Sequence, residues 1–327
     1  MARAIRIHQH GGPEVLSFEE VTVGSPGPKQ LRIRHTAIGV NFIDTYHRSG
    51  LYPVQLPSGL GVEAAGVVVE AGSKARGFVP GDRVAYVDST PGAYTEERVM
   101  EAARVVKLPD GISDLQAAAM MLKGLTAWFL LRRCYRVRKG DPIVLHSAAG
   151  GVGLIALQWA TALGARVIAV VGSDAKAALA SEHGAAEVIV YMREDLVARV
   201  REITRNRGVP VVYDGVGKDT FFASLDCLRP RGLMVSYGNA SGAVPPFSPL
   251  ELSRRGSLYL TRPTLFHYIA RASDRLRGAR ELFEIVAGGK VKVMIGQSYA
   301  LSNAAEAHRD LEARRTTGST ILIGAGS

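Results

Sequence analysis

Residues 148–153 read Ala-Ala-Gly-Gly-Val-Gly and stand between an apolar run at 143–146 and a longer apolar run from Leu154 onward. This pattern predicts a buried strand, a tight turn and a helix, and a second strand is expected at 166–171. The Gly-x-Gly-x-x-Gly template is met only in part, because Ala148 stands in place of the first glycine. The segment nevertheless indicates the first half of a dinucleotide-binding βαβ unit.

The residue types in this turn suit an anion. The N-terminus of a helix offers unpaired N–H groups to a pyrophosphate, and large side chains in the turn would block its approach. We therefore expect Gly150, Gly151 and Val152 to contact the cofactor.

The residues after the second strand bear on the choice between NADH and NADPH. An NAD site places Asp or Glu there to bind both ribose hydroxyls, whereas this chain has Gly172. Ser173 can donate a hydrogen bond to a 2′-phosphate, and Lys176 can supply positive charge. Asp174 departs from this pattern: it either faces solvent as a helix cap or turns inward and weakens the phosphate preference. The segment favours NADPH.

The elements that would position these residues fall into two groups. In the first part of the chain, short strands with Gly and Pro between them indicate a small barrel-like β domain. The expected strands are 3–8, 16–22, 30–38, 63–71, one that follows the turn at 79–85, and 92–99.

The character of the chain changes near Ser113. Ser113 and Gln116 have the spacing of a capping box before a helix, and another helix is expected over 125–135. From Asp141 onward, apolar runs alternate with helical segments, which is typical of a doubly wound parallel sheet covered on both faces. Six strands are expected, at 143–146, 167–171, 188–190, 211–214, 233–237 and 257–260.

The last part of the chain predicts a return to the first domain, with helices over 271–287 and 303–315 and a strand over 319–323. The length of 327 residues favours two domains. We expect a catalytic domain from 1–124 and 263–327, and a Rossmann cofactor-binding domain from 125–262.

Composition excludes several classes of protein. No run approaches the ~20 apolar residues of a membrane span, and the first residues lack the apolar core of a signal peptide. Two cysteines, Cys134 and Cys227, do not imply a disulfide framework, so the cytoplasm is expected. The formal charge of +10 raises the question of nucleic acid. The charges are spread along the chain without a nucleic-acid motif, which makes that role unfavoured.

Taken together, these motifs resemble those of the medium-chain dehydrogenase/reductase superfamily. The closest resemblance is to the zinc-free, NADPH-dependent quinone oxidoreductases, the group that includes zeta-crystallin. Besides the turn at 148–153, the resemblance rests on the segments Gly11-Gly-Pro-Glu-Val-Leu16, Gly61-Val-Glu-Ala-Ala-Gly66, Gly81-Asp-Arg-Val84 and Tyr213-Asp-Gly-Val-Gly217. It implies an α/β protein in which a GroES-like β-barrel-type catalytic domain joins a Rossmann domain, with a site in a cleft and a homodimeric assembly.

The resemblance also implies a site without zinc. Zinc-dependent relatives have a Cys at the position of Asn41 and a His at that of Val62, and zinc needs three or four ligands. Glu63 remains, which we interpret as a hydrogen-bonded structural acid.

The other site residues are carried over from the resemblance. The catalytic candidates beside the nicotinamide are Asn41, Asp44, Tyr46 and Tyr52. Residues expected around the cofactor, besides Asn41, the turn residues and those after the second strand, are Thr45, Lys123, Thr126, Phe129, Tyr191, Gly217, Asn239, Arg262, Leu265 and Arg314. Among these, Tyr191 and Arg314 are expected to hold the 2′-phosphate.

No Ser-His-Asp set or pair of carboxylates stands out, which fits hydride transfer carried by the cofactor. We expect NADPH to reduce a quinone. The alternative is reduction of an enone or alkenal double bond by NADPH. A third hypothesis, from another class, is an RNA-binding or structural crystallin-like protein.

Overall fold

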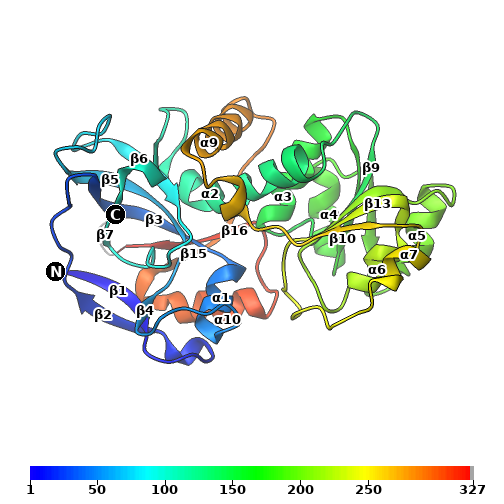
Figure 1. The fold of residues 1–327 in the computed structure, drawn as a ribbon, viewed down its shortest axis with the longest axis horizontal. Helices are drawn as coiled ribbons and strands as arrows, with labels where there is room; N and C mark the ends of the chain where they lie inside the picture. The colour runs from blue at the N-terminus through cyan, green and yellow to red at the C-terminus, as the bar shows by residue number, and fades with distance from the viewer. Residues whose placement is uncertain (325–327) are drawn as a thin grey trace. The chain divides into compact units, whose positions relative to one another are not determined.

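The computed structural model describes residues 1–324, which divide into two compact units (Figure 1). The first unit comprises Met1–Lys123, Ile269–Ala287 and the chain from Val293 on, and the second comprises Gly124–Tyr268 and Gly288–Lys292. The domains expected from the sequence differ from these units in three places, since Gly124 and the segments 263–268 and 288–292 belong to the second unit.

The first unit is built on two sheets. One has the order β15-β16-β3-β5-β6-β8, with β7 also paired to β3, and the other has the order β2-β1-β4. The strands are β1 (Ala2–Ile7), β2 (Ser17–Val21), β3 (Gln30–Val40), β4 (Ser58–Gly59), β5 (Glu63–Ala71), β6 (Arg83–Val87), β7 (Glu97–Glu101), β8 (Val105–Lys107), β15 (Ile295–Ala300) and β16 (Ser319–Ile323).

The end of the chain completes the larger sheet, as expected. β16 pairs antiparallel with β3, and β15 pairs parallel with β16 at the edge. The strand β15 was not predicted from the sequence. Its segment, Ile-Gly-Gln-Ser-Tyr-Ala, alternates between half-buried and exposed residues and contributes little apolar signal.

The alternation in β3 sets the barrel core. Leu31, Ile33 and Ala37 are fully buried, while Arg32 and Arg34 face outward. This is the period of two that a half-buried strand requires. The helices that lie wholly in this unit are α1 (Phe42–Ser49), α9 (Ala272–Ala287) and α10 (Ala304–Glu312), with short 3-10 turns η1 (Pro13–Val15), η2 (Ala102–Arg104) and η4 (Leu301–Asn303).

A single helix, α2 (Asp114–Phe129), replaces the two that the sequence predicted, and a π-helical turn (η3, Leu130–Cys134) follows it. The predicted capping box is present, because Ser113 and Gln116 exchange hydrogen bonds of 3.0 and 3.2 Å. The helix continues through the buried Gly124. A glycine in a helix costs about 1 kcal/mol, and burial of the flanking apolar residues outweighs that cost.

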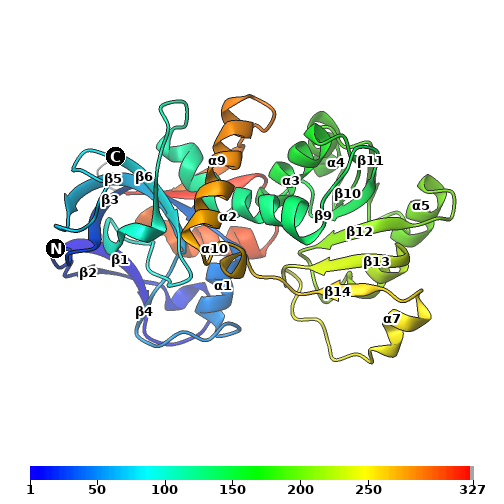
Figure 2. The ribbon, with the colours of Figure 1, turned by 45° about the horizontal axis from the view of Figure 1, so that its top comes forward.

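The second unit is a six-stranded parallel sheet in the order β11-β10-β9-β12-β13-β14 (Figure 2). This is the strand order of a full doubly wound dinucleotide-binding fold, and each of the six strands expected from the sequence is present. They are β9 (Pro142–His146), β10 (Arg166–Val171), β11 (Glu187–Val190), β12 (Val209–Asp214), β13 (Leu228–Ser236) and β14 (Tyr259–Thr261).

Helices cover this sheet. α3 (Gly151–Ala162) packs on β9 and β10, and α4 (Asp174–Glu182) packs on β10 and β11. Side chains of α5 (Leu196–Ile203) and α6 (Phe221–Asp226) share a buried cluster with Val144, Ile168 and Val212 of the strands. Two short helices, α7 (Leu250–Arg254) and α8 (Leu265–Tyr268), follow. Across residues 1–324, we find no helix with the length and apolarity needed to cross a membrane.

Candidate functional site

The glycine turn lies between β9 and α3. Ala148 and Ala149 are buried, and Gly150, in extended conformation, is the residue that precedes the helix. The first N–H of the helix with an intrahelical acceptor is that of Leu154, which donates to Gly150 O at 2.8 Å. Within the described chain, no side chain caps this end. The amides of the first turn are therefore available to a pyrophosphate.

Close packing at this turn requires Gly153. A β-carbon there would stand 2.1 Å from the carbonyl oxygen of Ser147. Ser147 itself adopts a left-handed conformation with φ of 52°. The turn thus folds tightly enough to bring the helix N-terminus against the end of β9.

The loops after β10 and β11 meet. The hydroxyl of Tyr191 lies 2.8 Å from where a β-carbon would stand on Gly172. Ser173 begins α4 and accepts a hydrogen bond from the backbone N–H of Lys176 at 3.4 Å. The structure thus brings together four of the residues expected at a 2′-phosphate, all in the second unit.

Asp174 is not the cap of α4, because Ser173 has that position. Its carboxylate instead forms an ion pair with Arg193 at 2.6 Å, and both side chains are largely exposed. Sequence reasoning missed Arg193. Its place two residues after Tyr191 was the only signal that could have found it.

The loops after β12, β13 and β14 also converge. Gly217 adopts a φ of 91°, and a β-carbon there would approach the Cα of Asn239 to 3.2 Å. With its amide oriented to satisfy both neighbours, Asn239 accepts a hydrogen bond from Arg262 at 3.1 Å and donates to the Gly238 carbonyl. Gly217, Asn239 and Arg262 therefore share one corner of the second unit.

Asp214 fixes the Gly217 loop. Its buried carboxylate accepts hydrogen bonds from the N–H groups of Val216 and Gly217 at 2.8 and 3.1 Å. It also accepts from the hydroxyls of Thr220 and Ser224 at 2.7 and 2.8 Å. Four donors to one carboxylate make this loop a pre-formed element.

Ser224, His146 and Asp214 form a set that the sequence did not suggest. Ser224 donates to Asp214, and its oxygen lies 2.9 Å from Nε2 of His146. The three side chains are buried, and burial lowers the pKa of His146. Because the serine proton is directed at the carboxylate and the imidazole faces the serine as a donor, this set is structural rather than nucleophilic.

The remaining predicted residues of the second unit lie on or after α2. Thr126 is mostly buried, and Leu265 is buried at the start of α8. Phe129 is only 1% exposed and stacks on Tyr268, with ring centroids 4.6 Å apart. The Phe129 ring thus serves packing within this unit, and its contact with the cofactor stays a prediction.

In the first unit, Glu63 gathers the residues expected beside the nicotinamide. Its fully buried carboxylate accepts hydrogen bonds from the Asn41 amide and the Lys123 ammonium, both at 2.8 Å. It also accepts from the backbone N–H of Leu122 at 2.6 Å. Glu63 is thus the hydrogen-bonded acid that we interpreted from the sequence.

Asp44 lies in a second buried network beside this one. Its Oδ2 accepts hydrogen bonds from the Asn41 backbone and the Tyr94 hydroxyl, both at 2.9 Å. Its Oδ1 has no hydrogen-bond partner among residues 1–324. Burial raises the pKa of Asp44 from 3.8 to about 7, and the nearby charge of Glu63 adds to the rise.

Behind Asp44, the network continues through His308. Nδ1 of His308 lies 3.0 Å from an Arg48 nitrogen that can only donate, so Nε2 carries the ring hydrogen and faces the Tyr94 hydroxyl at 3.1 Å. Burial lowers the pKa of His308 to about 3. Arg48 pairs in turn with Glu312 at 2.7 Å. Residues far apart in the sequence thus support one carboxyl group.

The two tyrosine candidates are neighbours. The rings of Tyr46 and Tyr52 are half-buried and lie edge to face, with centroids 5.2 Å apart. The hydroxyl of Thr45 donates to Phe42 O within α1 at 2.8 Å. Arg314 follows α10, is exposed and has a φ of 59°.

The site does not fit zinc. Among residues 1–324, no group of three or more His, Cys, Asp or Glu side chains could hold a metal ion. The two positions at which the resemblance implies zinc ligands in zinc-dependent proteins hold Asn41 and the fully buried Val62. The ammonium of Lys123 contacts Glu63, so the one remaining carboxylate already faces a cation.

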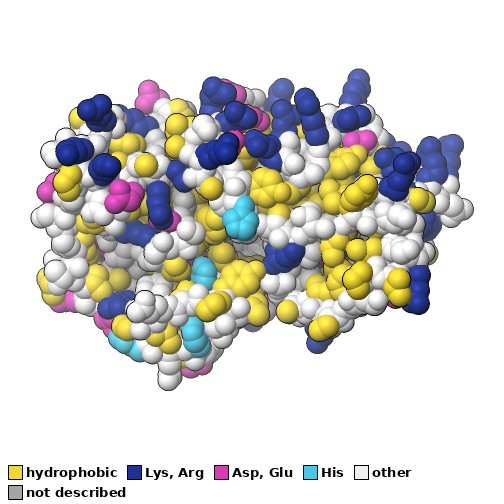
Figure 3. All heavy atoms as spheres, in the orientation of Figure 1, with side chains coloured by type: hydrophobic (Ala, Val, Ile, Leu, Met, Phe, Trp, Pro, Cys, Tyr) yellow, Lys and Arg dark blue, Asp and Glu magenta, His cyan; other side chains and the backbone are white. Residues whose placement is uncertain are grey.

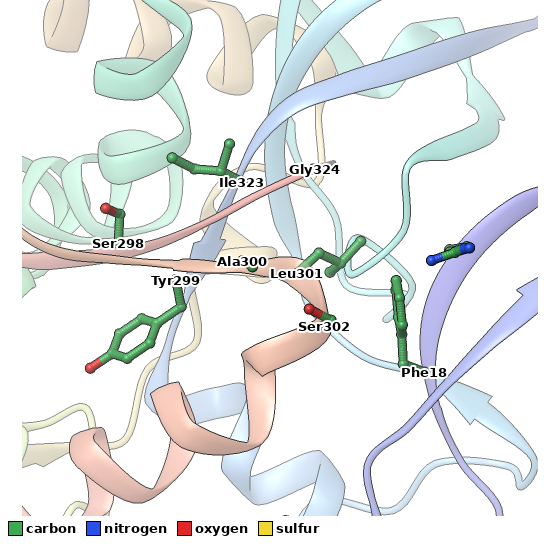
Figure 4. Close-up of a pocket in the computed structure, with 9 residues that line it drawn as sticks. Phe18, Ser298, Tyr299, Ala300, Leu301, Ser302, Ile323 and Gly324 are labelled. Atoms are coloured by element: carbon green, nitrogen blue, oxygen red, sulfur yellow. The ribbon is translucent and has the colours of Figure 1, made fainter. Parts of the chain in front are cut away.

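A recess of about 400 Å³ elsewhere on the first unit lies among β1, β2, β15 and β16 (Figure 4). Its lining includes Arg3, Phe18 and Tyr299 but none of the predicted site residues. We therefore do not place the reaction there.

Two family models match the chain. Residues 27–110 match the alcohol dehydrogenase GroES-like domain, and residues 151–284 match the zinc-binding dehydrogenase family. The second match covers most of the Rossmann unit and part of α9 in the first unit, and it includes neither Asn41 nor Val62.

Whole proteins of known name are also similar. A quinone oxidoreductase of Pseudomonas aeruginosa is 53% identical over 99% of this chain and 100% of its own length. A 2-haloacrylate reductase of a Burkholderia species is 44% identical over 99% of both chains. The crystal structure of Escherichia coli quinone oxidoreductase complexed with NADPH matches 98% of this chain and 100% of that chain, with 50% identity and a TM-score of 0.97.

We predict that Asp44→Asn changes how stability depends on pH. Because the pKa of Asp44 is raised to about 7, the folded protein holds this proton more tightly than the unfolded chain does. Its contribution to stability is fully present below about pH 4 and is lost as the pH rises through about 7. In urea unfolding, the free energy of the variant minus that of the wild type should therefore rise by about 4 kcal/mol from about pH 4 to about pH 8.

Because the variant is compared with the wild type, the contributions of the other titrating groups to the pH dependence of stability cancel. Burial lowers the pKa of His35 and His47 to about 4. Their contribution to the free energy of unfolding therefore rises with pH between about 4 and 6.5, whereas that of Asp44 falls over an overlapping range. They are common to both proteins. A difference that stays constant with pH would show that Asp44 is ionised throughout.

Proposed function

Because this chain belongs to the quinone oxidoreductase family of medium-chain dehydrogenases/reductases, we propose that it reduces a quinone with NADPH and without a metal. The chain is an NADPH-dependent oxidoreductase. Two features of the second unit carry the proposal. The N-terminus of α3 has no side-chain cap among the described residues. The loop after β10 has Gly172 where an NAD site would have a carboxylate, with Lys176 nearby on α4.

The second unit would hold the cofactor. The amides at Gly151 and Val152 would face the pyrophosphate, and Lys176 and Tyr191 would face the 2′-phosphate. Arg193 adds a further cation at this place, and Arg314 of the first unit is proposed on the resemblance alone.

The first unit would hold the acceptor. NADPH, when bound, supplies a hydride, and the protein's part is to orient the acceptor and provide a proton. The Asn41 amide carries two hydrogens, and Glu63 takes one, which leaves the other for a carbonyl oxygen of the acceptor. Reduction of a quinone to a hydroquinone also consumes a proton, which Tyr46, Tyr52 or water would donate to the reduced oxygen. Burial raises the pKa of Asp44, in the same segment, to about 7, so this carboxyl group would be able to hold a proton near neutral pH.

We also propose a homodimer in the cytoplasm, as the family resemblance implies. The physiological partner would be a small electron-poor molecule. A nucleic-acid or crystallin-like structural role is not favoured, because the site loops suit a dinucleotide.

A side-by-side acceptor panel tests the proposed reaction. We expect purified protein to oxidise NADPH faster with a naphthoquinone than with a 2-alkenal at equal concentration, in kcat/KM. The alternative has specific support from the similar protein named 2-haloacrylate reductase. A higher kcat/KM for the alkenal would establish the double-bond reductase instead.

We predict that Tyr46→Phe and Tyr52→Phe each lower kcat several-fold without abolishing it. An acceptor that needs little acid help loses only a fraction of the ~10²–10⁴-fold effect of a general acid, since water or the other tyrosine can replace the hydroxyl. Tyr259→Phe, at a site 63% exposed on β14, is the matched control and should leave kcat unchanged. Complete loss of activity in either variant would reveal an obligate acid.

The cofactor loops predict opposite effects of two substitutions. Lys176→Ala should raise the KM for NADPH about tenfold and leave that for NADH unchanged, because a charge-assisted contact to phosphate is lost. Asp174→Asn should lower the KM for NADPH, since it removes a negative charge and releases Arg193. Lys290→Ala is the control at an exposed lysine. Equal changes for NADPH and NADH would mean that these residues do not contact the 2′-phosphate.

A further inference from the structure

A second recess, of about 530 Å³, lies on the second unit away from the cofactor loops, which are the loops that follow β9, β10 and β12. Its lining comes from the ends of α5, α6 and α7 and the segments that lead into β12, β13 and β14. These segments stand at the amino ends of the strands, whereas Gly150, Gly172 and Gly217 follow the carboxyl ends. The recess and the cofactor loops therefore lie at opposite edges of one parallel sheet.

The surroundings of this recess are strongly basic. The segments 199–207, 225–232 and 251–257 contain eight arginines and three carboxylates, so their net charge is +5, half of the formal +10 of the chain. Figure 3 shows Lys and Arg side chains gathered at the end of the second unit that carries α5. Four of the arginines line the recess itself: Arg201, Arg207, Arg254 and Arg255.

Among the residues that the structure describes, two of these arginines, Arg201 and Arg207, contact only neutral groups. The guanidinium of Arg201 donates to the carbonyl oxygens of Asn206 (3.2 Å), Asp226 (2.7 Å) and Leu228 (3.4 Å). Arg207 donates to the carbonyl of Thr204 at 3.4 Å. These bonds fix the side chains without neutralising their charge. By contrast, Arg254 and Arg255 both pair with Glu251.

The backbone around the recess is held in unfavourable conformations. Of the six non-glycine residues with positive φ among residues 1–324, four border it: Arg205, Asn206, Arg231 and Ser257. Such conformations concentrate at functional sites. In addition, Val209 pairs with Leu228 and Val211 with Leu233, so residues 229–232 bulge out of β13. This bulge places two further exposed arginines beside the recess.

We propose that this recess is a second anion site, which binds a small oligophosphate, either inorganic or the phosphate chain of a nucleotide. Guanidinium forks match phosphate oxygens in geometry and charge. The described lining contains no aromatic side chain on which a base could stack. Binding of a single-stranded nucleic acid uses such aromatic platforms, so the chemistry favours the compact phosphate chain.

Titration calorimetry with sodium tripolyphosphate tests this site. The full-length protein is first saturated with NADPH, so that the cofactor loops are occupied. We expect tripolyphosphate to bind this complex, and Arg207→Gln/Arg254→Gln to weaken binding at least about tenfold. The matched control, Arg277→Gln/Arg280→Gln on α9, should bind as the wild type does. Both variants should retain the wild-type kcat/KM for NADPH oxidation, which shows that they are folded.

Three outcomes would overturn the proposal: no binding of tripolyphosphate, equal weakening in the control variant, or displacement of NADPH as the source of the signal. A 5′-hydroxyl oligouridylate, which carries only phosphodiesters, distinguishes recognition of an oligophosphate from recognition of a nucleic-acid backbone. If it binds more tightly than tripolyphosphate, the basic surface recognises a nucleic-acid backbone and the oligophosphate assignment is wrong.

Discussion

The buried carboxylate of Glu63 is the constraint on which the arrangement of the first unit depends. It accepts hydrogen bonds from Asn41, Lys123 and the backbone of Leu122, and so ties β5 to α1 and α2. A β-carbon on Gly39 would stand 2.2 Å from Oε1 of Glu63, so only glycine at this position of β3 leaves room for the carboxylate. Removal of one partner from a buried ion pair costs about 3–5 kcal/mol. The carboxylate therefore fixes the residues proposed to face the acceptor.

The same ion pair supports the proposed chemistry without a metal. The Lys123 ammonium supplies the positive charge that a buried carboxylate requires, so Glu63 needs no metal ion to be stable. The pair also affects its neighbour. Burial raises the pKa of Asp44, the Glu63 charge raises it further, and Lys123 acts in the opposite direction. The same group of charges thus holds β5, α1 and α2 together and contributes to a pKa of about 7 at Asp44.

The sequence predicted the second unit well because its central strands β9, β10 and β12 are buried and read as continuous apolar runs. It predicted β15 poorly, since that edge strand is half exposed and contains Gly296. It also divided α2 at Gly124, where burial of the flanking residues outweighs the helix propensity of glycine. The network from Asp44 through Tyr94 to His308 could not be predicted, because its members lie up to 264 positions apart and no spacing rule connects them. Likewise, the ion pair between Asp174 and Arg193 could not be predicted, because Arg193 lies on another loop. The sequence alone therefore left a helix cap as one interpretation of Asp174.

Two loops at the carboxyl edge of the Rossmann sheet differ in whether their backbone amides already have hydrogen-bond partners. After β12, the side chain of Asp214 accepts hydrogen bonds from the amides of Val216 and Gly217. These two amides therefore need no ligand as a hydrogen-bond partner. After β9, no described side chain caps α3, and the helix dipole adds positive potential at the same place. An anion would therefore be attracted at the β9–α3 turn, while the Gly217 loop would shape the site. Unsatisfied amides at one strand end and satisfied amides at another would direct the pyrophosphate of a dinucleotide to the glycine turn, as proposed.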